Sequence, residues 1–104
     1  MEILEVQNEA EFNALLEINE NVLVDFWAEW CGPCKAMNPV VAQFAEQYKD
    51  TQVVKVNCDY QQELAFKYNI RSIPCFVAFI DGKEVARHTG TGSLDQIMDL
   101  FGDL

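Results

Sequence analysis

The sequence predicts an α/β fold in which a central mixed sheet of five strands is flanked by four helices. Short apolar runs alternate along the chain with segments whose apolar residues recur every three or four positions, as strands alternate with amphipathic helices. The run at residues 22–27 is apolar except for Asp25, which is typical of a strand covered on both faces. Asp81 and Gly82 form a turn signal between two further runs, so the last two strands should be antiparallel.

The first half of the chain should supply three strands and two helices. A short strand at residues 3–6 precedes Asn8, which with Glu11 three positions later resembles the cap of a helix. After the second strand, apolar residues at helical spacing indicate a long helix. Pro39 should kink this helix, because an interior proline removes one helical hydrogen bond. The third strand is expected at residues 52–57.

The second half should supply two helices and a strand hairpin. Asp59 carries a glutamine three residues later and should cap a short helix. Strands are expected at residues 75–80 and 84–88. Ser93 also carries a glutamine three positions later and should cap the final helix. The buried stripe of that helix should comprise Leu94, Ile97, Met98, Phe101 and Leu104.

The composition fits a small domain that folds without disulfide bonds. Of the 104 residues 50% are hydrophobic, and no shift in composition marks a second domain, so one domain should span residues 1–104. The formal net charge of −10 disfavours nucleic acid as a partner, because such binding depends on Lys and Arg.

The N-terminus shows no export signal. Residues 1–6 lack the basic start and apolar core of a secretory signal, and no run approaches the roughly 18 apolar residues of a membrane span. We therefore expect a cytoplasmic protein that is monomeric and has no membrane partner. In a reducing compartment the four cysteines are more often catalytic, metal-binding or buried than part of a disulfide framework.

The chemistry of the sequence centres on Cys31 and Cys34, which are separated by Gly32 and Pro33. Pro33 suits the first position of a helix, which would place Cys31 at the helix N-terminus, where backbone N–H groups lower the pKa of a thiol. Cys34 would lie one turn deeper, where burial keeps its thiol protonated, and Cys31 would remain exposed. Gly32 would leave room for the backbone of a target. One exposed thiolate and one reserve thiol are what dithiol exchange requires.

Other interpretations of this pair remain open. It could be half of a zinc site that Cys58 and Cys75 complete, or it could be a purely structural bridge. The chain could also be a binding module whose action on a partner is independent of redox chemistry.

The chain resembles the thioredoxin family over essentially its whole length. The matching motifs are VDFWAEWCGPCK at residues 24–35, RSIP at residues 71–74, and Gly90 before the last helix. The resemblance implies a thioredoxin fold and an oxidoreductase that reduces disulfides in target proteins through a redox-active Cys31–Cys34 disulfide. It implies no bound cofactor and no metal, and it implies thioredoxin reductase as a partner in electron transport and cell redox homeostasis.

The same resemblance implies a role for each residue around the pair. Cys31 would be the attacking nucleophile, Cys34 would resolve the mixed disulfide, and Asp25 would assist the deprotonation of Cys34. Pro74 matches the cis-proline that lies beside the dithiol in this family, and Lys55 matches a lysine that pairs with the buried aspartate. The groove for the target would be lined by Trp30, Gly32, Pro33, Ile73 and Gly90.

Several of these residues also have simpler interpretations. Asp25 could bond to a nearby turn, although a carboxylate inside an apolar run has a desolvation cost that raises its pKa. Lys55 could extend to solvent, and Pro74 could be an ordinary trans-proline. Cys75 replaces the threonine that usually follows the cis-proline. We interpret Cys75 and Cys58 as small buried hydrophobes, with thiol exchange at the active pair as the alternative if Cys75 is exposed.

Overall fold

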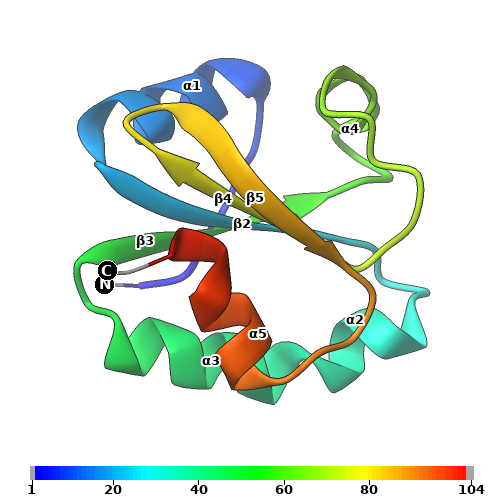
Figure 1. The fold of residues 1–104 in the computed structure, drawn as a ribbon. Helices are drawn as coiled ribbons and strands as arrows, with labels where there is room; N and C mark the ends of the chain where they lie inside the picture. Colours follow the sequence, from blue (N-terminus) through cyan, green and yellow to red (C-terminus); the bar gives the residue numbers. More distant parts are fainter. Residues whose placement is uncertain (1, 103–104) are drawn as a thin grey trace.

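A five-stranded mixed sheet forms the centre of the fold (Figure 1). The computed structural model describes residues 2–102. The strands are β1 Leu4–Glu5, β2 Asn21–Trp27, β3 Thr51–Asn57, β4 Cys75–Ile80 and β5 Lys83–Thr89. They lie in the order β1-β3-β2-β4-β5, in which β2 is parallel to β3 and antiparallel to β4. The predicted mixed sheet is confirmed, and β2 is its central strand.

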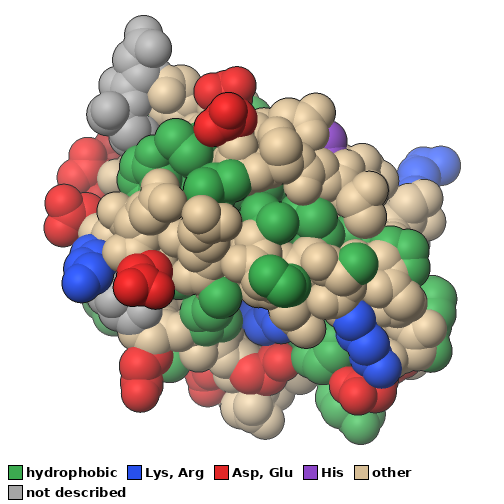
Figure 2. Space-filling view, turned by 90° about the horizontal axis from the view of Figure 1, so that it is seen from below, with side chains coloured by type: hydrophobic (Ala, Val, Ile, Leu, Met, Phe, Trp, Pro, Cys, Tyr) green, Lys and Arg blue, Asp and Glu red, His purple; other side chains and the backbone are tan. Residues whose placement is uncertain are grey.

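Helices cover both faces of this sheet. They are α1 Glu9–Ile18, α2 Gly32–Ala36, α3 Asn38–Gln47, α4 Gln62–Lys67 and α5 Leu94–Met98, followed by a 3₁₀ turn at Asp99–Phe101. α1 and α4 lie on one face, and α2, α3 and α5 lie on the other (Figure 1). On the surface above α2, α3 and α5, hydrophobic side chains form separate patches and the charged side chains lie mostly nearer the rim (Figure 2). None of the helices among residues 2–102 is long and apolar enough to cross a membrane.

Two apolar clusters fill the space between the sheet and its helices. On the α1 side the ring of Phe12 is fully buried, 5.6 Å from the ring of Tyr68 and 6.0 Å from that of Phe79. On the α3 side Phe44 stacks on Tyr48 with ring centroids 4.9 Å apart. Alternate residues of β2 enter the two clusters, which explains why its sequence is almost continuously apolar.

Two of the predicted helix caps are confirmed. The side-chain oxygen of Asn8 accepts the backbone N–H of Glu11 at 2.8 Å, at the start of α1. Ser93 and Gln96 form a reciprocal capping box at the start of α5. Leu104, expected at the end of the last buried stripe, lies outside the described residues.

The predicted cap at Asp59 is wrong. α4 begins at Gln62, and the preceding Gln61 makes no side-chain capping bond. The carboxylate of Asp59 instead accepts the indole N–H of Trp30 at 3.0 Å. A local pattern that resembles a helix cap therefore serves a contact between two distant loops.

The long helix predicted after the cysteine pair is divided into α2 and α3 at Met37. The N–H of Met37 bonds back to the carbonyl oxygens of Pro33 and Cys34, at 3.2 Å each, and ends α2. Pro39 lies in the first turn of α3, where its missing N–H removes no helical hydrogen bond. The structure therefore has two helices that meet at Met37 in place of one kinked helix, and Cys34 belongs to the shorter of the two.

The predicted hairpin between β4 and β5 is confirmed. Asp81 and Gly82 connect the two strands with φ angles of 51° and 79°, and two successive positive φ angles are the requirement of a tight type I′ turn. The ladder is irregular at Ala78 and Phe79, where the register shifts.

Truncation of Phe12 tests the cluster on the α1 side. Because its ring is fully buried against two aromatic neighbours, Phe12→Ala leaves a cavity and also loses apolar burial. We expect the free energy of unfolding, measured by urea denaturation, to fall by about 3–5 kcal/mol. Phe66→Ala is the matched control, because Phe66 is 85% exposed, and it should cost less than about 0.5 kcal/mol. Equal losses in the two variants would contradict this assignment of the core.

Candidate active site

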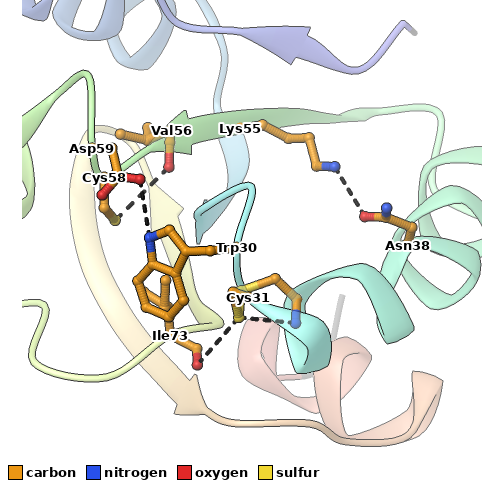
Figure 3. The surroundings of a disulfide bond; sticks show 9 residues. Trp30, Cys31, Asn38, Lys55, Val56, Cys58, Asp59 and Ile73 are labelled. Atoms are coloured by element: carbon orange, nitrogen blue, oxygen red, sulfur yellow. Dashed lines mark hydrogen bonds between the residues drawn. A yellow bond between two sulfur atoms is a disulfide. The ribbon is translucent and has the colours of Figure 1, made fainter.

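Cys31 and Cys34 form a disulfide bond in the turn that leads from β2 into α2, with their Cα atoms 5.3 Å apart (Figure 3). Cys31 caps α2, because its Sγ accepts the backbone N–H of Cys34 at 3.1 Å. Pro33 lies in the first turn of α2 as its second residue, one position later than predicted. The backbone N–H of Cys34, at the start of this helix, therefore faces Cys31 Sγ and favours a thiolate there when the bond is reduced.

The two cysteines are equally buried in the disulfide form, each with 3% of its surface exposed. The expectation that Cys31 alone is exposed is wrong for this form, because Ile73 packs against the disulfide and its carbonyl oxygen lies 3.8 Å from Cys31 Sγ. The two cysteines differ instead in what they face. Cys31 lines a shallow surface groove, whereas Cys34 does not.

The groove beside Cys31 contains three of the five residues expected to bind a target. Trp30, Pro33 and Ile73 line it, together with Cys58. Trp30 is 72% exposed, and its hydrogen bond to Asp59 holds the indole above the groove (Figure 3). Gly32 is exposed on the first turn of α2 but does not line the groove.

A cis peptide bond joins Ile73 to Pro74, as the resemblance predicted. Pro74 is buried and directly precedes β4. The N–H of Gly90 donates to the carbonyl oxygen of Pro74 at 2.7 Å, so Gly90 lies beside the proline and not in the groove itself. Gly90 has a φ of 93°, a left-handed conformation that a glycine adopts without strain.

Asp25 lies in the middle of β2 with 1% of its surface exposed. Within the described part of the chain, no group hydrogen-bonds to its Oδ1. The loss of hydration raises the pKa of Asp25 to about 7, an effect that the positive charge of Lys55 opposes and the negative charge of Glu5 strengthens. This carboxyl group can therefore exchange a proton near neutral pH.

Lys55 does not form the expected ion pair with Asp25. Its Nζ donates to Oδ1 of Asn38 at 3.0 Å and lies 5.0 Å from the ring centroid of Trp27 (Figure 3). These two contacts hold the ammonium group toward the start of α3 and away from the carboxylate. Lys55 is nevertheless the register partner of Asp25 on the neighbouring strand, so it acts on that carboxylate through space.

The other two cysteines differ in burial. Cys75 is 2% exposed, with its Sγ 3.7 Å from Oγ1 of Thr89, so its interpretation as a small buried hydrophobe is confirmed. Cys58 is half-buried; burial and then the charge of Asp59 raise the pKa of its thiol to about 11. Burial also raises the pKa of Cys75. Residues 2–102 contain no group of three or more metal-ligating side chains.

The sequence did not predict the roles of three polar side chains of the site. Asp59 was interpreted as a cap, while Asn38 and Glu5 were assigned no role. Glu5 Oε2 accepts the indole N–H of Trp27 at 3.3 Å. Each of these contacts joins residues distant in sequence, so no local pattern marks them.

A disulfide that opens to two thiols can carry two electrons between proteins by exchange, and this one lies at a surface groove where another chain can reach it. The fold and the site therefore define a thiol–disulfide oxidoreductase. Comparison with known proteins gives the family. The model of the thioredoxin family matches residues 3–102, so the chain belongs to this family. Members of the family use their own cysteine pair and no bound cofactor.

Individual relatives agree with this assignment. A thioredoxin from Mycoplasma genitalium is 39% identical over 97% of this chain and 99% of its own length. Thioredoxin 1 from Synechococcus elongatus is 53% identical over 68% of this chain and 67% of its own length. A thioredoxin structure from Plasmodium falciparum has a TM-score of 0.90 and 32% identity, covering 98% of this chain and 100% of its own. These relatives favour the redox function over the zinc-binding and redox-independent alternatives.

The buried Asp25 should make the protein less stable as the pH rises. Its pKa of about 7 in the folded protein lies above its ordinary value of 3.8, so the folded state binds this proton more tightly than the unfolded state. The contribution of Asp25 to stability is therefore highest below about pH 4, falls as the pH rises to about 7, and then levels off. Asp25→Asn should remove this fall, which amounts to about 4 kcal/mol, in urea unfolding measured across that pH range.

Glu17→Gln is the matched control for Asp25→Asn, because Glu17 is an exposed carboxylate on α1. This variant should keep the pH dependence of the wild-type protein. If the free energy of unfolding of Asp25→Asn depended on pH as strongly as that of the wild-type protein, the assignment of a raised pKa to Asp25 would be contradicted.

Proposed function

We propose that this protein reduces disulfide bonds in target proteins, with Cys31 as the attacking thiol and Cys34 as the resolving thiol. The observation that carries the assignment is the position of Cys31, which caps α2 and also lines the surface groove. Cys34 has neither position. In the reduced protein the start of α2 stabilises the thiolate of Cys31, and an anionic sulfur at the groove is the attacking group.

The first step is the attack of the Cys31 thiolate on one sulfur of a target disulfide. The new bond joins Cys31 to that sulfur, the target disulfide breaks, and the second target sulfur leaves as a thiolate that takes up a proton. Pro74 and the residues in or beside the groove hold the target segment during this step. These residues are Trp30, Gly32, Pro33, Ile73 and Gly90.

The second step releases the target. Asp25 accepts the proton of Cys34, and the Cys34 thiolate attacks Cys31 Sγ. This attack breaks the bond between Cys31 and the first target sulfur, which leaves as a thiolate and takes up a proton. A pKa of about 7 suits Asp25 to this transfer, and the nearby charge of Lys55 supports the carboxylate form. In total, two electrons and two protons pass from the dithiol to the target disulfide.

The oxidised protein then needs a reductant, for which we propose a flavin- or ferredoxin-dependent thioredoxin reductase that completes the electron transport. The net charge of −10 favours partner surfaces with a basic rim. A reducing compartment such as the cytoplasm suits a protein that keeps Cys58 and Cys75 as free thiols. One sheet covered on both faces supports a single domain over residues 1–104 that acts as a monomer.

Serine variants of the two cysteines test these roles. Cys31→Ser should slow the reduction of insulin disulfides by on the order of 10³-fold or more, because the nucleophile is lost. Cys34→Ser should instead accumulate a mixed disulfide between Cys31 and the target, detected by mass spectrometry without reductant. Cys75→Ala, at a buried cysteine outside the site, is the control and should keep the wild-type rate.

Near-normal insulin reduction by Cys31→Ser would contradict the assigned roles. So would a trapped mixed disulfide at Cys34 in place of Cys31. If the variant with both cysteines replaced by serine still supported the activity of a partner protein, the function would be binding that is independent of redox chemistry.

A further inference from the structure

Three charged side chains stand in one row across three neighbouring strands. In the register of the sheet, Glu5 of β1 pairs with Lys55 of β3, and Lys55 pairs with Asp25 of β2. Residues paired in register point to the same face of a sheet, so Lys55 stands between the two carboxyl groups. Glu5, Lys55 and Asp25 together form a charged row across the sheet.

Trp27 fixes the outer carboxylate of this row. Its indole N–H donates to Glu5 Oε2 at 3.3 Å, and Nζ of Lys55 lies 5.0 Å from the centroid of its ring. Trp27 follows Asp25 by two residues in β2, so both side chains belong to the same face of the sheet. Glu5 is therefore held in the row by a direct contact, although β1 is an edge strand.

Among residues 2–102, no hydrogen bond to Oδ1 of Asp25 fixes the protonation of this carboxyl group. Lys55 is bonded to Asn38, and none of the described residues hydrogen-bonds to Oδ1 of Asp25. The charge of Asp25 therefore responds to groups at longer range. Lys55 favours its carboxylate form, and Glu5 disfavours it.

The other titratable groups around Asp25 come from the remaining elements packed on β2. Cys34 of α2 is in the disulfide in this structure. The thiols of Cys58, which follows β3, and of Cys75 on β4 stay protonated at neutral pH, because burial raises the pKa of each. On β5, the ring of His88 bonds to the carbonyl oxygen of Thr91 at 2.9 Å. Lys55 and Glu5 are therefore the charges to which Asp25 is most directly exposed.

We propose that Glu5 is a positioning residue that sets the proton affinity of Asp25. The inference rests on the proposed role of Asp25 as the base for Cys34, because Glu5 affects the reaction through that proton transfer. The negative charge of Glu5 repels the carboxylate form of Asp25. Without that charge, Lys55 acts on Asp25 alone, and Asp25 releases its proton at a lower pH.

The size of the effect follows from the spacing of the strands. Glu5 and Asp25 are two strands apart, which is about 9.5 Å between their backbones. In a water-like dielectric, two unit charges at this distance change a pKa by about 0.3, and the lower dielectric of a protein enlarges the change. Glu5→Gln should therefore lower the pKa of Asp25 by about 0.3 to 1.

Three variants separate the charge of Glu5 from its shape. Glu5→Gln removes the charge but keeps an oxygen that accepts the indole N–H of Trp27. Glu5→Asp keeps the charge but shortens the side chain and weakens that contact. Glu17→Gln removes an exposed charge from α1, on the opposite face of the sheet, and is the matched control for net charge.

Two measurements apply to each variant. The pKa of Asp25 in the oxidised protein is measured by NMR of its carboxyl carbon, which requires no turnover. The pH profile of mixed-disulfide resolution is measured by stopped-flow. We expect Glu5→Gln to lower the pKa and to move the profile to lower pH by the same amount, while Glu5→Asp and Glu17→Gln remain close to the wild-type protein.

An unchanged Asp25 pKa in Glu5→Gln overturns the role of Glu5. An equal fall in Glu17→Gln also overturns it, because the effect would then be one of general surface charge. An equal fall in Glu5→Asp would assign the effect to the contact with Trp27 and not to charge. A lowered pKa in Glu5→Gln alone, with an unchanged pH profile, supports the role of Glu5 and overturns the separate proposal that Asp25 is the base for Cys34.

Discussion

The site depends on one hydrogen bond, from the N–H of Cys34 to Sγ of Cys31, which fixes the cysteine pair at the first turn of α2. The position of that turn is fixed by β2, which pairs with β3 on one side and β4 on the other. A shift of the end of β2 would disturb the hydrogen bonds to both strands. Because the helical segment is divided at Met37, α2 is a separate short helix. The segment that ends in Pro74 then packs against the disulfide, so the remaining parts of the site are placed relative to this turn.

The same central strand carries a carboxyl group that the fold alone does not need. Asp25 is buried between two apolar clusters with an unbonded oxygen, and an apolar residue there would continue the pattern of β2. Its charged form is offset only in part, because Lys55 is held by Asn38 and Trp27. A local conflict between burial and polarity is expected where a sequence has been selected for chemistry, and here it lies two residues before the end of β2 that leads to the cysteine pair.

Much of the fold could be predicted from the sequence, because its signals are local. The caps at Asn8 and Ser93 and the turn at Asp81 each depend on residues within a few positions of one another. The predicted helix cap at Asp59 was wrong for the opposite reason, because its carboxylate accepts a hydrogen bond from Trp30, which is distant in sequence. Periodicity could indicate a bend near Pro39 but could not place the break at Met37, since that depends on backbone bonds at the end of α2.

The candidate site divides in the same way. The cysteine pair and the cis-proline could be recognised from motifs, but the burial of Cys31 could not, because Ile73 approaches it from another part of the chain. The contacts of Glu5 and Lys55 required the strand order β1-β3-β2, which no periodicity contains. The most direct test of the central claim is alkylation of each thiol in the reduced protein between about pH 5 and pH 9, counted by mass spectrometry. Cys31 should react with a lower pKa than Cys34, and equal rates for the two thiols at every pH would contradict the division of roles between them.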